Sequence, residues 1–277
     1  MTTLRRCRPL LGTFVEITAT GTTSDTIEQA FAAIDRIHRL MSFHSTDSDL
    51  ARIRTVAWGE PVFVAPETFA VLKLCQSLWH ATDGLFDIAV GASLVTDGYL
   101  PKPQSFAAFK FDGTTGDLEL RTDGTVICHR PMLIDLGGIA KGYAVDQACE
   151  VLLAEGAEDI LINAGGDLRT AAGPPVEIVI RDQRGRSVDR VLLDNGALAS
   201  SDNSRSRRRR WTGRLLSPHR DRARRAVASR SVTTVLSPTC AMADALTKVA
   251  MVDSRLANRI AQAQGGRVVA MPDGIGA

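Results

Sequence analysis

The chain has 277 residues, 44% of them hydrophobic, which is enough for a packed core in one large domain or two small ones. No stretch approaches the roughly 20 apolar residues of a membrane span, and the arginine-containing N-terminus lacks the apolar region of a secretory signal. The five cysteines are odd in number and widely spread, which argues against a zinc site or a disulfide framework. We therefore expect a cytoplasmic protein without a membrane span.

The charge is concentrated in one segment. Between Ser204 and Ser231 lie eleven arginines and one acid, Asp221, so this window carries a net charge of +10 and the rest of the chain −8. Such a segment is typical of a solvated or partly disordered surface loop. Alternatives are contact with the phosphates of a ligand, with an acidic protein or membrane surface, or with nucleic acid. We expect no specific nucleic acid, because Trp211 is the only interleaved aromatic residue and no reading module is recognisable.

The first half of the chain predicts a strand over residues 12–20 and then a helix. Asp25 and Glu28 have the spacing of a capping box, and apolar residues from Ile27 to Met41 follow a helical stripe. Pro66 favours the start of a second helix that ends before Gly84. Residues 117–120 and 125–129 predict a β-hairpin.

The second half predicts a helix from about residue 138 to 154, stopped by Gly156, and two more helices over 240–252 and 254–264. Strands are expected over 160–163, 176–181, 190–193, 231–236 and 267–271. Because strands follow one another in runs, we expect an α+β fold with largely antiparallel sheets and packed helices. We expect a single domain over 1–277, with a basic irregular segment at about 202–230.

The stretch Ile134-Asp-Leu-Gly-Gly-Ile-Ala-Lys-Gly-Tyr-Ala-Val-Asp146 places three glycines and Lys141 at a helix entrance. Glycine lets backbone approach a ligand closely, and a helix N-terminus favours anions, so the motif is typical of a phosphate site. The alternative is a tight strand-to-helix turn with Lys141 in solvent.

Three further clusters carry polar groups at turns or on one helix face. Asp87 follows Gly84-Leu85-Phe86, where the alternative is a helix C-cap followed by a strand. Asn163-Ala-Gly165-Gly166-Asp167 offers backbone N–H groups to an anion, or else forms a hairpin turn. Asp244 and Thr247 lie one helical turn apart and offer oxygen ligands for Mg²⁺, unless Asp244 only caps its helix.

In their order and spacing these clusters resemble the FAD:protein FMN transferases, the ApbE-type flavin transferases. The resemblance covers nearly the whole chain, and the glycine–lysine motif is its most specific part. The matching segments are Leu11-Gly-Thr-Phe14, Met41-Ser-Phe43, Ser48-Asp-Leu50, Gly84-Leu-Phe-Asp87, Val90-Gly91, Ile134 to Asp146, Asn163 to Asp167 and Ala243-Asp-Ala-Leu246.

The resemblance implies an ApbE-like, T-fold-related fold and a reaction. Such enzymes bind FAD and Mg²⁺ and move FMN onto a threonine or serine hydroxyl of a target protein, releasing AMP. The implied partner is therefore a flavin-accepting protein, membrane-associated or not, with the oligomeric state left open. Attack on a diphosphate needs alignment and charge stabilisation more than a strong protein nucleophile.

The resemblance also implies roles for individual residues. Lys141 is expected beside the diphosphate, Asp244 at the metal, and His219 on the acceptor side as catalytic groups. The metal is expected on the Gly138 carbonyl, Asp244 and Thr247. The expected FAD-binding residues are Leu11, Phe43, Leu85, Phe86, Asp87, Lys141, Asp146, Gly165 and Gly166.

The chain departs from the family pattern at three places. Leu11 stands where methionine is common, an apolar exchange. Lys248 stands four residues after Asp244, where the family has its metal-binding threonine; Thr247 could substitute, or Lys248 could supply part of the cation's charge. Residues 199–203 and 217–221 match the family's later motifs only loosely, with His219 as the stand-in histidine; the alternative is a degenerate loop and an impaired enzyme.

Three other functions remain open at this point. A Mg²⁺-dependent FAD diphosphatase would use the same residues, with water in place of the acceptor hydroxyl. A non-catalytic FAD-binding protein would account for Lys248 and the altered His219 region. A nucleic-acid-binding module would account for the arginine-rich window.

Overall fold

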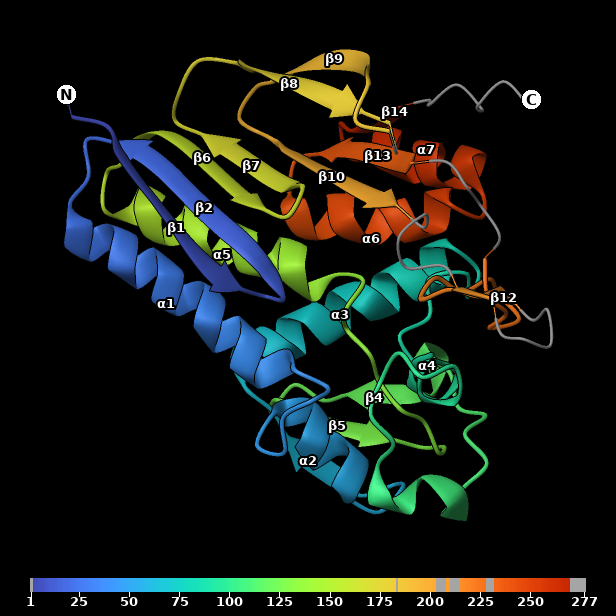
Figure 1. The fold of residues 1–277 in the computed structure, drawn as a ribbon. Helices are drawn as coiled ribbons and strands as arrows, with labels where there is room; N and C mark the ends of the chain where they lie inside the picture. Colours follow the sequence, from blue (N-terminus) through green and yellow to red (C-terminus); the bar gives the residue numbers. More distant parts are fainter. Residues whose placement is uncertain (1, 183, 203–207, 210–214, 228–231, 270–277) are drawn as a thin grey trace, which may run out of the picture. The chain divides into compact units, whose positions relative to one another are not determined.

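The computed structural model describes residues 2–182, 184–202, 208–209, 215–227 and 232–269 (Figure 1). The chain divides into two compact units, each assembled from separate segments. The first unit comprises Met1–His38, Ile139–Arg205 and Ser229–Ala277, and the second comprises Arg39–Gly138 and Ser206–Ala228. The expectation of a single domain stays a prediction.

The first unit is built on a seven-stranded sheet in which every neighbouring pair is antiparallel. In spatial order the strands are β1 (Leu4–Leu10), β2 (Thr13–Thr20), β6 (Glu158–Ala164), β7 (Asp167–Ala171), β10 (Ala197–Asp202), β13 (Val232–Ser237) and β14 (Arg267–Val269). A separate hairpin pairs β8 (Val176–Arg181) with β9 (Ser187–Leu193).

Helices cover one face of this sheet. As Figure 1 shows, α5 (Ala140–Ala154) lies along β6 and β7, and α6 (Cys240–Ala250) lies along β10 and β13. The two helices also contact each other, and α7 (Ser254–Ala263) packs against α6 and β14. This arrangement brings the start of α5, the start of α6 and the β6–β7 turn into one region.

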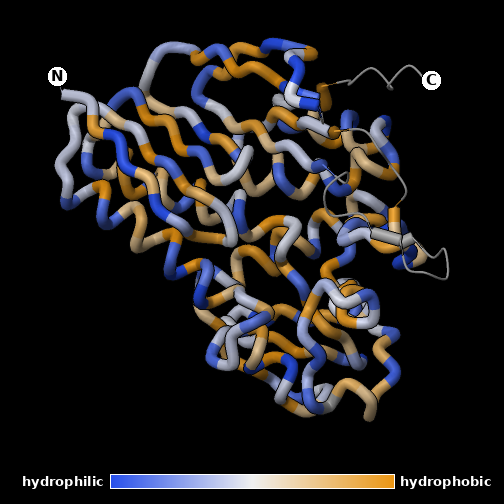
Figure 2. The backbone as a smooth tube through the Cα atoms, in the orientation of Figure 1, coloured by the Kyte–Doolittle hydropathy of each residue, from blue (hydrophilic) through white to orange (hydrophobic). Residues whose placement is uncertain are grey.

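The sequence pattern explains the elements at the start of the chain. In β2, alternate residues Val15, Ile17 and Ala19 are fully buried, as a strand with one covered face requires. Figure 2 shows hydrophobic and hydrophilic residues alternating along strands of the large sheet. The predicted apolar stripe of α1 (Ser24–Met41) is buried from Ile27 to Met41. Its predicted capping box is wrong, because Thr23 rather than Asp25 caps the helix: Thr23 Oγ1 accepts the N–H of Thr26 at 3.1 Å.

The second unit contains helices and a small sheet. The helices are α2 (Asp49–Thr55), α3 (Pro66–Ala81) and α4 (Gly91–Thr96), with 3₁₀ turns η1 (Gln104–Ala108) and η2 (Thr115–Asp117). The sheet has the antiparallel order β3-β5-β4 from Pro61–Phe63, Thr125–Cys128 and Leu118–Leu120. A further pair joins β11 (Arg208–Arg209) to β12 (Leu215–Leu216).

The predicted fold class, α+β with antiparallel sheets and packed helices, is confirmed. Strand β1 was not predicted, because an arginine-rich edge strand exposed on both sides shows no apolar alternation. Across the described ranges, no helix combines the length and the apolar character needed to cross a membrane.

Candidate active site

The start of α5 is held against the start of α6 by Gly142. A Cβ atom at this position would lie 2.2 Å from the carbonyl oxygen of Cys240, so there is no room for any side chain. The Gly142 N–H also donates to Asp244 Oδ2 at 3.3 Å. This glycine of the motif therefore serves close contact between two helices, and the contact brings Lys141 beside Asp244.

Asp146 fixes the N-terminus of α6. Its Oδ1 accepts the N–H of Cys240 and its Oδ2 accepts the N–H of Ala241, both at 2.8 Å. These are the first two residues of α6, whose own N-cap residue, Thr239, makes no side-chain capping bond. Arg169 lies 3.4 Å away as a countercharge. Asp146 therefore caps a neighbouring helix, and its predicted contact with FAD stays a prediction.

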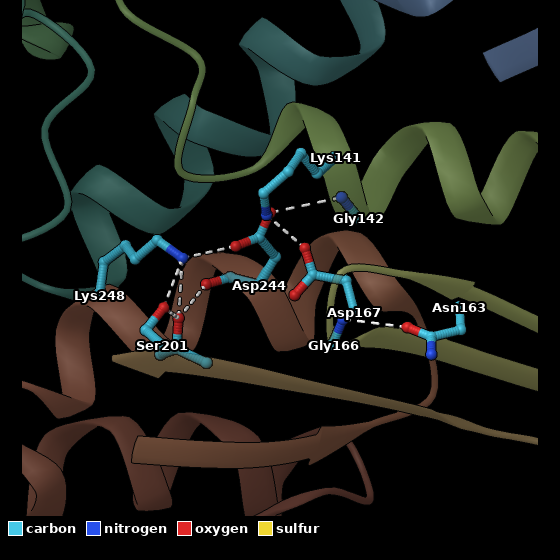
Figure 3. Close-up of polar contacts among 9 residues, drawn as sticks. Lys141, Gly142, Asn163, Gly166, Asp167, Ser201, Asp244 and Lys248 are labelled. Carbon is cyan, nitrogen blue, oxygen red and sulfur yellow. Dashed lines mark hydrogen bonds and ion pairs between the residues drawn. The ribbon is translucent and has the colours of Figure 1, made fainter. Parts of the chain in front are cut away.

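Four charged side chains meet in this region, as Figure 3 shows. Lys141 Nζ donates to Asp167 Oδ2 and, at 3.3 Å, to Asp244 Oδ2. Lys248 Nζ donates to Asp244 Oδ1 at 2.5 Å. Both carboxylates are almost fully buried, whereas the Lys141 and Lys248 side chains are 33% and 22% exposed. We call these four residues the charge cluster; its formal charges cancel.

Lys248 Nζ lies among three oxygen atoms. Besides Asp244 Oδ1, it donates to Ser201 Oγ at 2.8 Å and to Thr247 Oγ1 at 3.0 Å. The Thr247 hydroxyl in turn donates to the carbonyl oxygen of Asp244 at 2.6 Å. The residues come from β10 and α6, which are packed together.

The charge cluster shifts the pKa values of its members. Burial alone would raise the pKa of Asp244, but the charges of Lys141 and Lys248 outweigh burial and lower it to about 2. For Asp167, burial and the charge of Asp244 outweigh Lys141 and raise the pKa to about 6. Burial would lower the pKa of Lys141, but the two carboxylates raise it. At neutral pH both carboxylates are ionised.

The predicted Mg²⁺ ligands Asp244 and Thr247 do not suit a divalent cation as arranged here. A Mg²⁺ about 2.1 Å from Asp244 Oδ1 would lie within about 4.6 Å of Lys248 Nζ. At an effective dielectric constant of about 20, that repulsion is about 7 kcal/mol. Within the described residues no group of three His, Cys, Asp or Glu side chains could hold a metal. A metal would therefore have to displace the Lys248 ammonium group.

Gly165 and Gly166 form the two-residue turn between β6 and β7. Both have positive φ, +65° and +101°, and Ala164 pairs with Asp167 across the turn. The Gly166 N–H donates to Asn163 Oδ1 at 3.0 Å. The motif therefore forms a hairpin turn, one of the two structures expected from the sequence. The turn places the Asp167 carboxylate beside Lys141. Contact of the two glycines with FAD stays a prediction.

In the second unit, Asp87 binds groups of the protein itself. Its Oδ1 accepts from the N–H of Ala89 at 2.9 Å and from the N–H and hydroxyl of Thr115 at 3.0 and 2.7 Å. Its Oδ2 pairs with Arg224 at 2.9 Å. Asp87 therefore organises its loop and the segment that carries Arg224.

The other predicted residues of the second unit lie in varied surroundings. Phe43 is buried in an apolar cluster with Val95 and Leu133, and the Arg54 guanidinium lies 5.0 Å from its ring centroid. Phe86 is buried and its N–H donates to Thr82 Oγ1, whereas Leu85 is half-buried. His219 and Gly138 are half-buried. His219 lies three residues after the end of β12, and Gly138 lies two residues before the start of α5.

The described part of the basic window is attached to the second unit through its arginines. Arg220 is buried and pairs with Asp97 at 3.1 Å, and its Nε donates to Ser93 Oγ at 2.8 Å. Arg222 donates to the carbonyl oxygen of Thr82, and Arg224 pairs with Asp87. These arginines bind the protein's own acids and carbonyls. Within the irregular segment predicted at about 202–230, residues 208–209 and 215–216 form β11 and β12. Residues 203–207, 210–214 and 228–230 lie outside the described residues.

Asp167 and Ser201 were missed as site residues. Asp167 closes the Asn-Ala-Gly-Gly-Asp motif, but a hairpin turn alone does not tell which way the next carboxylate points. Ser201 lies within β10, in residues 199–203, which match the family pattern only loosely. The contacts of both depend on strand pairing between distant segments: β10 pairs with β7 and with β13.

Comparison with known proteins agrees with this fold. The family model described as ApbE matches residues 11–271. Among curated relatives, the FAD:protein FMN transferase of Vibrio cholerae is 27% identical over 190 residues, covering 62% of this chain and 56% of the relative. That of Haemophilus influenzae is 27% identical over 208 residues, covering 67% of this chain and 60% of the relative. The chain thus spans less than two thirds of the length of either relative.

Solved structures are similar over more of the chain. Flavin transferase ApbE from Vibrio cholerae superposes with a TM-score of 0.77 at 24% identity, covering 96% of this chain and 92% of the other. The ApbE protein from Thermotoga maritima gives 0.81 at 25% identity, covering 96% and 93%. The chain belongs to the ApbE family, and the predicted resemblance is confirmed.

Proposed function

We propose that this chain transfers FMN from FAD to a threonine or serine hydroxyl of a target protein and releases AMP. The observation that carries the proposal is the family match over residues 11–271 in a chain that gathers Lys141, Asp167 and Asp244 into one charge cluster. The curated relatives named FAD:protein FMN transferase support the same reaction.

The reaction replaces a phosphoanhydride bond of FAD with a phosphoester bond to the acceptor. The acceptor oxygen forms a bond to the phosphorus of the FMN half, and the bond from that phosphorus to the bridging oxygen breaks. AMP leaves with the bridging oxygen, and the acceptor hydroxyl gives up its proton. Negative charge on the transferred phosphoryl group and leaving AMP must be aligned and stabilised.

We assign to Lys141 the role of stabilising this negative charge. Its ammonium group is oriented by the buried carboxylates Asp167 and Asp244, while a third of its side chain is exposed. An oriented ammonium group offers a fixed positive charge to a diphosphate without reorganisation during the reaction. Asp167 and Asp244 act as positioning residues for Lys141.

The remaining assignments stay predictions of the proposed function. They are FAD contacts by Leu11, Phe43, Leu85, Phe86, Asp87, Asp146, Gly165 and Gly166, and acceptor-side catalysis by His219. The Mg²⁺ expected on Gly138, Asp244 and Thr247 would first have to displace Lys248 from Asp244. A membrane-associated acceptor and a cytoplasmic location are likewise predictions, to be checked by pull-down and by cell fractionation.

The proposal is tested by incubating the protein with FAD and a panel of candidate acceptor proteins, with and without Mg²⁺. We expect an acceptor to gain the mass of one phosphoester-linked FMN, with AMP released in equal amount. Lys141→Met should abolish the mass gain, whereas Lys73→Met on the exposed face of α3 should leave it unchanged. Free FMN with unmodified acceptors would indicate an FAD diphosphatase, and unreacted bound FAD a non-catalytic flavin protein.

A further inference from the structure

The oxygen atoms around Lys248 Nζ form a cation site within the protein. We propose that Lys248 is the resident cation of this site: its ammonium group takes the place of a divalent metal beside Asp244, so that FAD binds without a metal on Asp244 and Thr247. The choice of FAD as the nucleotide rests on the proposed function. The arrangement of Lys248 and its three oxygen partners does not depend on that choice.

The geometry satisfies the ammonium group. A lysine head has three N–H donors and no acceptor, and three oxygens lie at 2.5, 2.8 and 3.0 Å from Lys248 Nζ: Asp244 Oδ1, Ser201 Oγ and Thr247 Oγ1. A carboxylate and hydroxyl oxygens are also what a hard divalent cation selects. The protein's own side chain thus occupies the position that such a cation would need.

Lys248 behaves differently from an ordinary surface lysine. Every other residue of α6 is buried, and the Lys248 side chain is 22% exposed. A side chain this exposed can reach water, yet the Lys248 ammonium group lies against Asp244, a buried residue four positions earlier in the chain. An aspartate N-terminal to a lysine at this spacing is the favourable order on a helix.

The charges agree with the geometry. With Lys141 and Lys248 present, the carboxylates Asp167 and Asp244 are neutralised without any added ion. A divalent cation would raise the cluster to +2 with both ammonium groups in place. Removal of the Lys248 charge would leave the charge cluster with one uncompensated negative charge. The oxygens Asp244 Oδ1, Ser201 Oγ and Thr247 Oγ1 would then lack their cation. Substitution of Lys248 should therefore open the site to a metal.

The experiment measures bound Mn²⁺ by electron paramagnetic resonance, on the full chain, with Mn²⁺ alone and with Mn²⁺ plus ADP. We expect no stoichiometric Mn²⁺ in the wild-type protein and about one per chain in Lys248→Thr, with Lys248→Gln as a second variant. The matched control Lys73→Thr should behave as wild type. One Mn²⁺ per wild-type chain that is lost in Asp244→Asn would overturn the proposal. So would a folded Lys248→Thr that binds no more Mn²⁺ than wild type.

A second measurement separates this inference from the proposed function. FAD affinity, followed by quenching of flavin fluorescence, should be the same within twofold in EDTA and in excess Mg²⁺. A tenfold or greater gain from Mg²⁺ that is lost in Asp244→Asn would contradict a resident lysine cation. Absence of FAD binding under both conditions would remove the proposed function, while the Mn²⁺ count on wild type would still decide the role of Lys248.

Discussion

Substitution of Gly142 by alanine tests how the charge cluster is assembled. An added Cβ would lie 2.2 Å from the Cys240 carbonyl oxygen and 2.8 Å from the Ala241 Cα, about 1 Å inside ordinary contact. In an open helix interior, glycine to alanine gains about 1 kcal/mol. Here the added atom meets backbone, which cannot rotate away, so overpacking of about 1–3 kcal/mol or more should outweigh that gain.

The assay is urea unfolding of Gly142→Ala, with Glu150→Ala on the exposed face of α5 as the control. We expect a net loss of up to about 2 kcal/mol in the free energy of unfolding, with the control within about 0.5 kcal/mol of wild type. Separation of α5 from α6 should also weaken the Lys141–Asp244 contact and lower FAD affinity. A Gly142→Ala protein about 1 kcal/mol more stable than wild type would refute close helix contact at this glycine.

Three further predictions concern buried charges. Asp146→Ala should cost about 2–4 kcal/mol of unfolding free energy, because the first two N–H groups of α6 lose charged acceptors; a loss below 0.5 kcal/mol in urea unfolding would contradict this role. Arg220→Met should cost about 3–5 kcal/mol because it removes the buried cationic partner of Asp97, whereas the exposed Arg222→Met should cost little. Equal losses in the two variants would argue against a structural Arg220. The pKa of Asp167 is raised to about 6, so the folded state binds this proton more tightly than the unfolded state. Wild type should therefore lose stability relative to Asp167→Asn as pH rises from about 4 to about 6. Stability curves that stay parallel over this pH range would contradict the raised pKa.

Much of the fold follows from local pattern in the sequence. The apolar stripe from Ile27 to Met41 and the buried alternation in β2 describe faces that only the core can cover. Strands with weak local signals were missed: β1 is exposed along both sides, and the last four residues of β10 alternate little in polarity. Such strands are defined by their partners rather than by their own residues.

Lys141 and Asp244 of the charge cluster could be singled out from the sequence, whereas Asp167 and the contacts among these residues could not. The glycine–lysine motif singled out Lys141 and the segment Ala243 to Leu246 singled out Asp244, and the two side chains form an ion pair. The sequence cannot show that Gly142 touches the Cys240 carbonyl or that Asp146 caps α6. Both contacts join segments about one hundred residues apart. Lys248 stood out as a departure from the family pattern, and only its three oxygen partners show it as an enclosed cation.

Transfer of FMN by this chain is tested most directly by the intact mass of an acceptor protein after incubation with FAD, measured together with the AMP released. We predict a mass gain of one FMN phosphoester per modified hydroxyl and an equal amount of AMP, lost in Lys141→Met and retained in Lys73→Met. Unmodified acceptors with no AMP, from a protein that is folded and binds FAD, would contradict flavin transfer.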